Sequence, residues 1–470
     1  MKQAIRKRWI GGLLGLFVVP ISAHFGVKWL AQPTPPALTM PPAGEVEQAG
    51  TSRRFGHGEA LVDARLHLVR LEGSSEEIGV QHTKLLYDSM VQTERRFLNR
   101  YRQYVPNPAA RFVLTDLALF RFFDIDHGMT LERRREIGAM AASFTPDPFA
   151  DFLPTYQRLV YLNAIYDISL AFEGSPLLGC TTFFVAGSKS QHTLLARNFD
   201  FEVDSIFDEK KTLFIVKEAG KIPYVSVSWP GLVGSVTGVN RHGLALVVHG
   251  GRAGDLARKG EPVLHILRDV LSTATNVEEA YTELVRHPIM VSHVIIMADR
   301  SGHAEAVERV PGRAPYHYRL ADRAVVTNHL VGPSADDPKN VRIRAKTSTL
   351  DRQQRGQQLL SAHDGPIEAE TLISFLRDRK GINGVTLPLG DRRALGALIA
   401  AHGVAVDLTA GRLWVGGTPT LLGPYYGLDL ETLFDDSVPL ERLLDDAPSI
   451  AADPLLNSPE YAAYRKEHER

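Results

Sequence analysis

The pattern of apolar and polar positions divides the chain into a helical first part and a β-rich second part. Residues 65–71 alternate apolar and polar side chains, as a strand does. Ser74 and Glu77 then form a capping-box pattern, and the apolar residues that follow fall near helical spacing, which together predict a helix. The same spacing predicts helices over Ala110–Phe123, Leu131–Ser143 and Tyr156–Phe172. Residues 61–179 are therefore expected to be mainly helical.

From Cys180 onward the pattern changes to short strands separated by turn residues. Strands are predicted at Thr181–Ala186, Thr193–Arg197, Leu213–Val216, Tyr224–Trp229, Leu244–Val248, Val294–Ala298, Ala304–Val307, Ala324–Thr327, Gly403–Leu408 and Leu413–Gly416. Helices are predicted between them at Pro262–Thr273, Val277–Arg286 and Thr349–Ser361. Strands joined by hairpins, with helices in separate blocks, indicate an α+β fold with antiparallel sheets. We assign residues 180–440 to this part and residues 441–470 to an acidic, helical tail.

The first 31 residues carry the pattern of an export signal. The basic run Arg6-Lys7-Arg8 precedes an apolar stretch that reaches Ala23. Two interpretations stay open, a signal peptide cleaved near Ala23 and a retained anchor in which Trp9–Leu30 spans the ~30 Å hydrocarbon core of a membrane. A buried helix of a soluble protein is a third, and the flanking basic run argues against it. Export predicts a membrane-anchored, periplasmic or secreted protein whose catalytic part lies outside the cytoplasm.

The residues after this segment are rich in proline. Residues 32–60 include Gln32-Pro-Thr-Pro-Pro and Pro41-Pro42-Ala-Gly44. Proline-rich linkers adopt extended, semi-rigid conformations, so we expect a stiff, unstructured tether here.

Composition limits the classes of function that fit. The chain has 470 residues, of which 44% are hydrophobic and 23% charged, as in ordinary globular proteins. Its 53 Lys and Arg against 54 Asp and Glu give a net charge of -1, so no nucleic-acid partner is expected. The single cysteine excludes an intramolecular disulfide, a Cys-based zinc finger and an iron–sulfur cluster. A His-Glu-x-x-His zinc motif is absent as well, so we expect no metal.

The lone cysteine is either buried packing or a nucleophile, and its neighbours favour the nucleophile. A turn centred on Lys189-Ser190 would pair two strands so that Cys180 faces about Phe199. Asn198 and Asp200 are then its diagonal neighbours, and Arg197 lies roughly opposite Thr182. A guanidinium, a carboxamide and a carboxylate beside a thiol make a reactive environment.

Two kinds of base could activate this thiol. The first is a histidine, as in papain-like enzymes, and several lie near predicted strands: His192, His242, His249, His293 and His329. The second is the cysteine's own α-amino group, freed by cleavage between Gly179 and Cys180, whose ordinary pKa of ~7.7–8.0 lies near neutrality. Gly179 suits such a cut, because a residue without Cβ tolerates a strained backbone.

The motifs around Cys180 resemble those of a known family. Gly179-Cys180-Thr-Thr, followed by Ala196-Arg197-Asn198-Phe199-Asp200, is similar to the nucleophile segment of the autoproteolytic cysteine Ntn (N-terminal nucleophile) hydrolases. The closest likeness is to isopenicillin-N (penicillin) acyltransferase-like proteins, with choloylglycine hydrolases and acid-ceramidase-type amidases as relatives. Four further stretches are similar in the same order: Gly73–His82, Thr237–Leu244, Thr327–His329 and Ser348–Arg355. Thr83 stands where the family usually has Gly, a departure that concerns helix packing and leaves the chemistry untouched.

The resemblance, which spans about residues 65–430, implies a fold and an activity. The fold would be the four-layer αββα arrangement, with two stacked antiparallel sheets between helical layers. Self-cleavage at Gly179–Cys180 would make Cys180 the nucleophile and its amine the base. The enzyme would then hydrolyse or transfer the acyl group of a linear amide through a Cys180 thioester. No cofactor is implied.

The family's remaining site residues map onto five positions. Arg197 and Asp200 would orient the amine and the thiol of the cysteine. Asn328 would donate to the oxyanion, and Asn240 would shape or complete the oxyanion hole. Arg352 would hold the site electrostatically. Each has a plain structural alternative: Asn240 and Asn328 are also good turn or capping residues, and Arg352 could face solvent.

Asn198 lies within the same matched segment. It would contact substrate or complete the oxyanion hole, or else it would bond to backbone.

Two other functions compete with this interpretation. A serine esterase is disfavoured, because no Gly-x-Ser-x-Gly nucleophile elbow occurs in the sequence. A non-catalytic Ntn-fold binding protein remains open, since fold does not determine activity. The substrate class also stays open among N-acyl amino acids, N-acyl ethanolamides, acyl-homoserine lactones, β-lactam amides and acyl thioesters. The expected partners are therefore a small molecule, a membrane through the N-terminus, and a second copy of the chain in a homo-oligomer.

Overall fold

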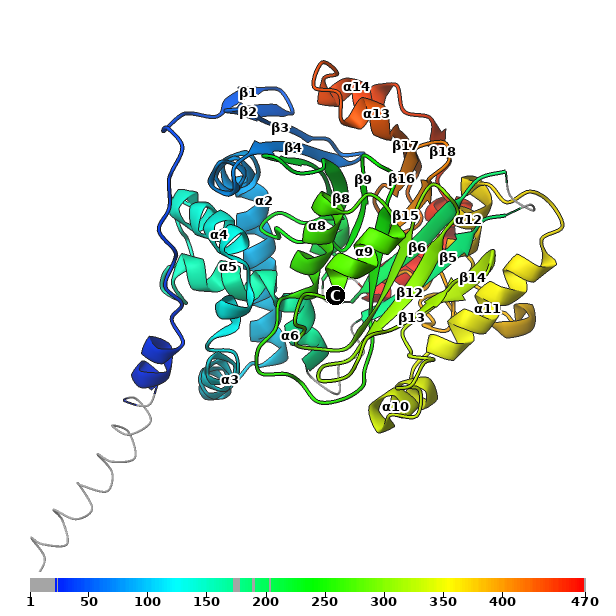
Figure 1. The fold of residues 1–470 in the computed structure, drawn as a ribbon, viewed down its shortest axis with the longest axis horizontal. Helices are drawn as coiled ribbons and strands as arrows, with labels where there is room; N and C mark the ends of the chain where they lie inside the picture. The colour runs from blue at the N-terminus through cyan, green and yellow to red at the C-terminus, as the bar shows by residue number, and fades with distance from the viewer. Residues whose placement is uncertain (1–21, 23, 172–177, 188–190, 203, 469–470) are drawn as a thin grey trace, which may run out of the picture.

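Two β-sheets, each built from segments far apart in the sequence, form the centre of the molecule (Figure 1). The computed structural model describes residues 22, 24–171, 178–187, 191–202 and 204–468. Within these, the larger sheet has the strand order β1 (Glu47–Ala49), β2 (Ser52–Phe55), β3 (Gly58–Val62), β4 (His67–Gly73), β7 (Thr212–Glu218), β8 (Tyr224–Ser228), β9 (Thr237–Asn240), β10 (Ala245–Gly250), β11 (His293–Ala298), β12 (Ala304–Arg309) and β13 (Tyr316–Arg319). The smaller sheet has the order β14 (Arg323–Val326), β5 (Leu178–Val185), β6 (Leu194–Phe201), β15 (Ala400–Asp407), β16 (Arg412–Gly416), β17 (Tyr425–Asp429) and β18 (Ser449–Ile450).

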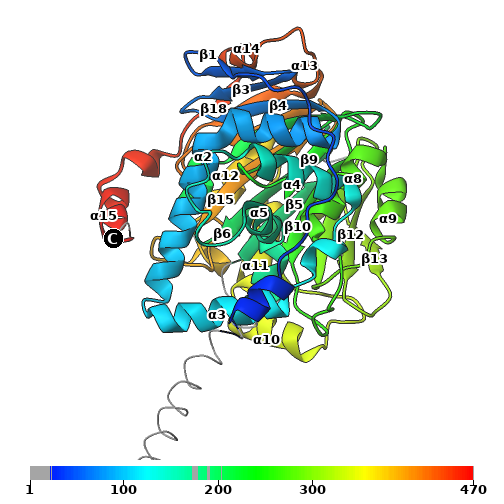
Figure 2. The same cartoon turned by 90° about the vertical axis from the view of Figure 1, so that its left-hand side faces the viewer.

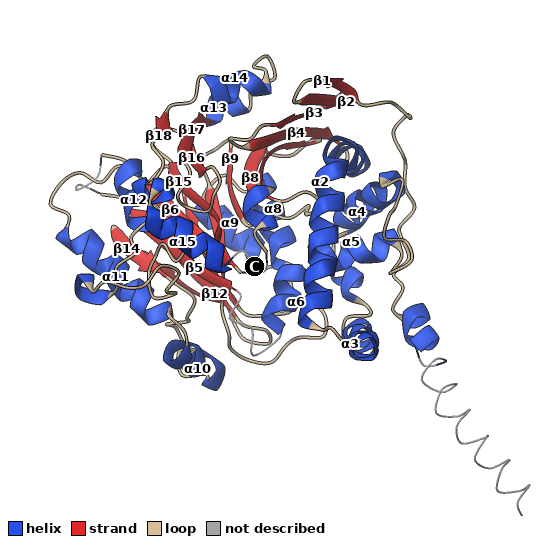
Figure 3. Ribbon diagram, turned by 180° about the vertical axis from the view of Figure 1, so that it is seen from behind, coloured by secondary structure: helices blue, strands red, loops and turns tan. Residues whose placement is uncertain are grey.

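Helices cover the outer faces of both sheets (Figure 3). On the side of the larger sheet lie α2 (Ser75–Tyr104), α3 (Pro108–Arg121), α4 (Leu131–Ser143), α5 (Thr155–Asn163), α6 (Ile165–Ala171), α8 (Val263–Thr273) and α9 (Val277–Leu284). Against the smaller sheet pack α11 (Thr349–Ala362) and α12 (Ala369–Leu376). Shorter or peripheral helices are α7 (Ile206–Glu209), α10 (Pro338–Lys346), α13 (Leu430–Leu433), α14 (Leu440–Asp445), α15 (Pro459–His468), η1 (Ile125–Gly128), η2 (Ile382–Gly384) and η3 (Pro454–Asn457).

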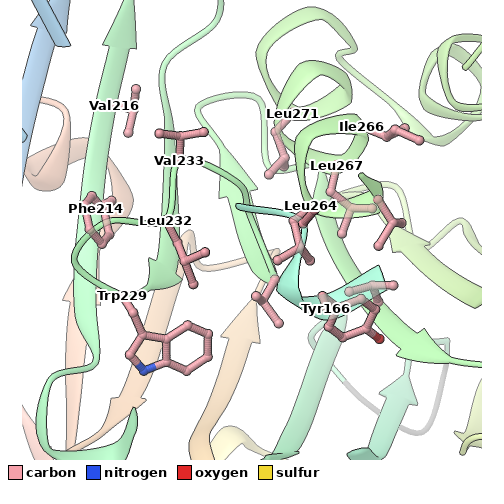
Figure 4. Close-up of a cluster of buried hydrophobic side chains, with 14 of the residues drawn as sticks. Tyr166, Phe214, Val216, Trp229, Leu232, Val233, Leu264, Ile266, Leu267 and Leu271 are labelled. Carbon is pink, nitrogen blue, oxygen red and sulfur yellow. The ribbon is translucent and has the colours of Figure 1, made fainter. Parts of the chain in front are cut away.

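Apolar side chains fill the three spaces between the four layers; the cluster between the smaller sheet and its helices includes Phe183, Leu360 and Leu372. Between the sheets, Leu213 and Val247 of the larger sheet share one buried cluster with Phe184 and Val404 of the smaller. Between the larger sheet and its helices, a second cluster joins β7 to α8 around Leu264 (Figure 4). Because successive residues point to opposite faces, each strand of the larger sheet alternates its side chains between these two spaces, and each strand of the smaller sheet alternates between the inter-sheet space and its own helices. The predicted αββα arrangement is therefore confirmed.

Several elements begin and end where the sequence predicts. Helix α4 spans Leu131–Ser143 as expected. Helix α2 starts behind Ser74, whose hydroxyl accepts from the Glu77 N–H while the Glu77 carboxylate accepts from the Ser74 N–H. The hydroxyl of Thr83 donates to the carbonyl of Met140, so this residue does serve the packing of α2 on α4. The helix expected over 156–172 is split, because α5 ends at Asn163 and α6 begins at Ile165.

Other expectations need correction. The sheets are antiparallel except where β4 runs parallel to β7, a pairing between strands far apart in the sequence. Residues 47–60, expected to belong to an unstructured linker, form β1, β2 and the start of β3, with turns at Gly50 and Gly56 that have positive φ. Residues 32–46 have no regular structure but are bonded to the helices, for example through the Thr34 carbonyl to Arg134 (3.3 Å). This segment is thus docked and does not hang free.

The two ends of the chain differ in what is described. Most of the predicted signal or anchor, residues 1–21 and 23, lies outside the described residues. Among the helices that are described, none is both long and apolar enough to cross a membrane. The acidic tail is only partly helical, because β18 adds a short strand beside β17 between α14 and α15.

Candidate active site

Cys180 lies in β5, paired with β6 in the register predicted from the turn. Cys180 is the partner of Phe199, and Thr182 is the partner of Arg197. The turn residues 188–190 themselves lie outside the described chain. Because residues opposite each other on paired strands share a face, the thiol and the Arg197 side chain lie on one side of the smaller sheet. That side faces the larger sheet, since Thr182 Oγ1 is 2.7 Å from His249 Nε2 of β10.

The sulfur of Cys180 is fully buried and contacts a cation. Arg197 Nη2 donates to Sγ at 3.0 Å, and the thiol points to the Val248 carbonyl at 3.9 Å. The other end of the same guanidinium is fixed by the Thr237 hydroxyl (2.8 Å) and the Val236 carbonyl (3.1 Å). Burial raises the pKa of the Cys180 thiol, and Arg197 works against that shift. The intact chain therefore holds a protonated thiol beside the group that would stabilise its thiolate.

The backbone of Cys180 is held as firmly as its side chain. Its N–H donates to Asn328 Oδ1 at 2.7 Å, and its carbonyl accepts from Arg352 Nη1. Arg352 also donates to Asn328 Oδ1 (2.9 Å) and to Thr181 Oγ1 (2.8 Å), so it joins the two residues. Asn328 in turn is anchored because its N–H donates to the Thr349 hydroxyl (2.9 Å). Arg352 is 4% exposed, so the interpretation of a solvated residue is wrong.

Asp200 lies beside the peptide bond that self-cleavage would break. It is the partner of Gly179 across the hairpin, and a Cβ at Gly179 would come within 2.8 Å of Asp200 Oδ2. Burial raises the pKa of Asp200 to about 6, although Arg352 and Arg197 oppose the shift. Among the described residues its Oδ1 has no hydrogen-bond partner. A buried carboxyl group with a free oxygen therefore adjoins the Gly179–Cys180 bond.

The role of Gly179 differs from the expectation. Gly179 is part of an extended strand and is not among the glycines with positive φ, so the strain argument has no support. What the missing Cβ provides is room for the Asp200 carboxyl group.

The grouping of Asn198 and Asp200 with the thiol also needs correction. Their numbers place them on the opposite face of β6 from Arg197 and Phe199. Asn198 Nδ2 donates to the carbonyls of Leu376 (2.9 Å) and Leu395 (3.0 Å) on the side of α12. Both of its amide protons are thereby committed to backbone, so its contacts match the structural alternative.

Asn240 is likewise held in a structural position. Its Nδ2 donates to the carbonyls of Leu271 and Ala274 at the end of α8. Its Oδ1 accepts from the N–H groups of His242 and Leu244, which closes the turn between β9 and β10. No amide proton is left for an oxyanion, so these contacts support the turn interpretation.

No histidine contacts the thiol in the part of the chain that the structure describes. His249 is bonded to Thr182 and to the Thr327 carbonyl, and burial lowers its pKa well below the ordinary value. His329 lies between the hydroxyls of Thr327 (3.2 Å) and Thr349 (3.1 Å). The ring of His293 is buried, and burial lowers its pKa to about 3. These rings support strands and loops around the site.

The other two candidate histidines lie elsewhere. His192 forms an ion pair with Asp407 at 2.8 Å. His242 follows Asn240 in the turn.

Sequence reasoning missed three residues of the site. Thr237 orients Arg197, and Thr349 orients Asn328. His402 stacks on Phe199 with ring centroids 5.3 Å apart and contacts the Thr237 hydroxyl at 2.9 Å. No pattern of spacing in the sequence marks these threonines and this histidine as site residues, because their contacts join segments far apart in the chain. Only the register of β6 with β15, which follows from the whole sheet, places His402 beside Phe199.

A cavity of about 110 Å³ lies beside the end of β10. Its lining includes Leu170 of α6, Gly251 at the end of β10 and Ile343 of α10. The lining residue Gly251 directly follows Gly250, whose carbonyl accepts from Asn328 Nδ2 at 3.2 Å.

Comparisons with known proteins give one family match and several remote structural likenesses. A sequence model of the family described as acyl-coenzyme A:6-aminopenicillanic acid acyl-transferase matches residues 186–386. That range begins after Cys180 and includes Arg197, Asp200, Asn328 and Arg352. No curated protein matches the chain significantly in sequence.

Solved structures show remote likeness. One is the Caenorhabditis elegans ortholog of N-acylethanolamine-hydrolyzing acid amidase, with 15% identity and a TM-score of 0.37 over 49% of this chain and 93% of that one. Another is penicillin V acylase from Agrobacterium tumefaciens, with 17% identity and a TM-score of 0.38 over 54% and 86%. A third is a mutant of conjugated bile acid hydrolase from Clostridium perfringens, with 13% identity and a TM-score of 0.36 over 53% and 92%. Over residues 186–386, the chain is thus similar to the acyl-coenzyme A:6-aminopenicillanic acid acyl-transferase family.

Proposed function

We propose that the chain is an amidohydrolase or acyltransferase that cleaves itself at Gly179–Cys180 and then works through a Cys180 thioester. The observation that carries the proposal is the fixation of Cys180 at three atoms. Arg197 contacts Sγ, Asn328 accepts from the backbone nitrogen, and Arg352 donates to the carbonyl oxygen. A merely structural buried thiol requires none of these contacts. A residue about to become a nucleophile with its own base requires all of them, because sulfur and nitrogen must keep their positions after the chain is cut.

Self-cleavage would follow from the chemistry of this arrangement. The Cys180 sulfur attacks the Gly179 carbonyl carbon, a C–S bond forms and the C–N bond to Cys180 breaks. The Asp200 carboxyl group beside this bond donates a proton to the departing nitrogen, and the thiol proton passes to solvent, from which Asp200 is reprotonated. Water then hydrolyses the thioester, which leaves a Gly179 carboxylate and a free α-amine and thiol on Cys180.

Turnover would use the same atoms. The new α-amine takes the thiol proton, and the thiolate beside Arg197 attacks the carbonyl carbon of a bound amide. The proton passes to the leaving amine as the amide C–N bond breaks and an acyl thioester forms. Water releases a carboxylic acid, or an acceptor amine takes the acyl group. Asn328 is the side chain best placed to donate to the developing oxyanion, and one such donor typically contributes ~10²–10³ in rate.

Denaturing electrophoresis tests the self-cleavage. The purified protein should separate into a fragment ending at Gly179 and a fragment of residues 180–470. Cys180→Ala should remain a single inactive chain, and Cys180→Ser should cleave slowly if at all. An active protein that runs as one intact polypeptide would refute the proposal, and a histidine base would then have to be sought.

Iodoacetamide labelling at pH 7 separates an enzyme from a non-catalytic binding protein of the same fold. Because the Cys180 thiol is fully buried in the intact chain, uncleaved protein should react slowly. The cleaved protein should react rapidly, since its thiol then has a free amine as base. A cleaved protein whose thiol stays inert would favour the binding protein.

The substrate class is tested by a panel of N-acyl amino acids, N-acyl ethanolamides, acyl-homoserine lactones, β-lactam amides and acyl thioesters. Release of acid identifies a hydrolase, and transfer to an added amine identifies an acyltransferase. Cys180→Ala should abolish both reactions.

We also propose that the chain is exported, on the basis of its N-terminal sequence. The basic run Arg6-Lys7-Arg8 and the apolar stretch up to Ala23 support this. With a retained segment, activity should sediment with membranes and be released by detergent. A soluble exported protein that begins near His24 would instead identify a cleaved signal peptide.

A further inference from the structure

Helix α3 presents an apolar face to solvent, the reverse of an ordinary surface helix. Val113, Leu117 and Phe120 share one side of this helix and are 54%, 58% and 66% exposed. The only fully buried residue of α3 is Leu119. Surface helices normally turn their apolar stripe inward and their charged residues outward. Burial within this chain therefore does not explain the composition of α3.

A second segment extends this apolar surface. Residues 24–30 are helical and lie beside α3 (Figures 1 and 2). His24 Nδ1 is 2.6 Å from Asp116 Oδ1 of α3. Val27 and Ala31 pack on Leu119.

The outward side of this segment is also apolar. Phe25, Trp29 and Leu30 are 66%, 76% and 63% exposed. We call these three residues, with Val113, Leu117 and Phe120, the α3 surface. Two segments about eighty residues apart in the sequence thus meet in one exposed apolar patch, and such patches mark interaction sites.

We propose that the α3 surface lies in the interface of a lipid bilayer. The exposed positions of residues 24–30 and of α3 include no acidic side chain, and the basic side chain of Arg121 is exposed at the end of α3. Apolar and aromatic residues with a basic flank are typical of segments that lie in the headgroup region of membranes. Residues 24–30 also directly follow the apolar stretch that Arg6-Lys7-Arg8 precedes. The proposed export segment is therefore joined to the fold at this patch.

A single-cysteine probe tests this contact separately from any anchoring by the first residues. Cys180 is the only cysteine, so Cys180→Ala provides a cysteine-free, uncleaved chain. In this background, Leu117→Cys is labelled with an environment-sensitive NBD fluorophore. The matched control is Val385→Cys, labelled in the same way, because Val385 lies next to η2 and is 59% exposed. Vesicles of phosphatidylcholine and phosphatidylglycerol should shift the emission of the probe at 117 to the blue and raise it at least twofold. The probe at 385 should stay unchanged.

Substitution of the neighbouring positions provides the second arm. Val113→Glu with Phe120→Glu should abolish the response at 117, whereas Val331→Glu, at another exposed apolar residue, should keep it. Unchanged thermal melting of each variant shows that the fold is intact. A probe at 117 that does not respond while the chain co-sediments with vesicles overturns the proposal. A probe already shielded without vesicles, in a chain that elutes as a dimer, also overturns it and assigns the surface to a second copy.

Discussion

At the scale of single residues, the site depends on one guanidinium that holds the sulfur and a second that holds the backbone. Arg197 and Arg352 approach Cys180 from opposite faces of the smaller sheet, since one bonds Thr237 of the larger sheet and the other belongs to α11. Two fixed cations around one residue favour an anion there, and burial alone would disfavour it. The balance between the two cations and burial sets how readily the thiol ionises.

Arg197→Met tests this balance. The variant removes the cation 3.0 Å from Sγ while filling similar space, so the pKa of the thiol in the cleaved protein should rise. We expect self-cleavage and kcat/KM to fall by ~10²-fold or more, in line with the loss of a fixed electrostatic group. The pH dependence of iodoacetamide labelling measures the shift. The control is Arg355→Met. Arg355 lies on the same helix as Arg352 and pairs with Asp378, so its loss should change neither the cleavage rate nor kcat/KM. Equal effects from both variants would contradict a specific role of Arg197.

The raised pKa of Asp200 predicts a pH dependence of self-cleavage. Because this carboxyl group titrates at about 6 in the intact chain, it is protonated below that pH and can donate to the departing nitrogen. The fraction that carries the proton falls as the pH rises through 6, so cleavage of freshly refolded chain should slow between pH 5 and pH 7. Asp200→Asn should cleave slowly and without this transition. A wild-type rate that rises over the same interval would show that the carboxylate, not the acid, is required.

The sequence predicts part of this site, and the reasons are local. The pairing of Cys180 with Phe199 follows from the position of one turn, because a short hairpin fixes the register of its strands. The face of each side chain also follows from strict alternation, which places Asp200 on the face opposite the thiol, so the expected grouping of the two is wrong. The role of Asn240 could not be decided from its motif, because an asparagine that closes a turn and one that donates to an oxyanion have the same neighbours in sequence. Thr349 acts only through tertiary contacts.

At the scale of elements, prediction succeeds where the signal lies within the element itself. Helix α4 has its N-cap at Thr130 and the length expected from its apolar spacing. The strands within residues 47–62 were not predictable from proline content, because they depend on pairing with β4. The parallel pairing of β4 with β7 depends on segments separated by the whole helical part, which no local pattern records.

A buried ionic network joins elements on both sides of the proposed cut. Glu136 of α4 accepts from Arg133 (2.7 Å) and from Arg268 of α8 (2.8 Å), and Arg268 donates to Glu218 of β7 (2.9 Å). Burial opposes ionisation of Glu218, but Arg268 and Arg133 outweigh it and lower its pKa. Residues 133 and 136 precede Cys180, and residues 218 and 268 follow it. The network therefore ties the two fragments together.

Glu136→Gln should weaken this tie strongly. The substitution leaves two buried guanidinium groups with one carboxylate fewer, and breaking a buried pair typically costs ~3–5 kcal/mol. We expect the free energy of unfolding of the uncleaved Cys180→Ala chain to fall by about 3 kcal/mol in urea. Glu132→Gln on the same helix, where the carboxylate is 54% exposed, should change it by less than ~0.5 kcal/mol. Similar losses of unfolding free energy in both variants would show that the buried network contributes no more to stability than a surface ion pair.

At the scale of the whole molecule, self-cleavage would cut the chain without dividing the fold. The part before Cys180 supplies β1–β4 to the same sheet that β7–β13 complete, and β4 pairs with β7 along His67–Gly73. Helix α2 packs on these strands, and α4 packs on α2. Both fragments thus share one sheet and one buried core, so they should elute together under native conditions.

The central claim is that the working nucleophile is an N-terminal cysteine, and the mass of the covalent intermediate tests it most directly. Protein quenched in acid during turnover of a slow amide or thioester substrate should give a fragment that begins at Cys180, and this fragment should carry one acyl group. The acyl group should be bound through sulfur, and therefore be released by hydroxylamine, while the α-amine stays free. An acyl group on an intact, uncleaved chain, or on any residue other than Cys180, would contradict the account.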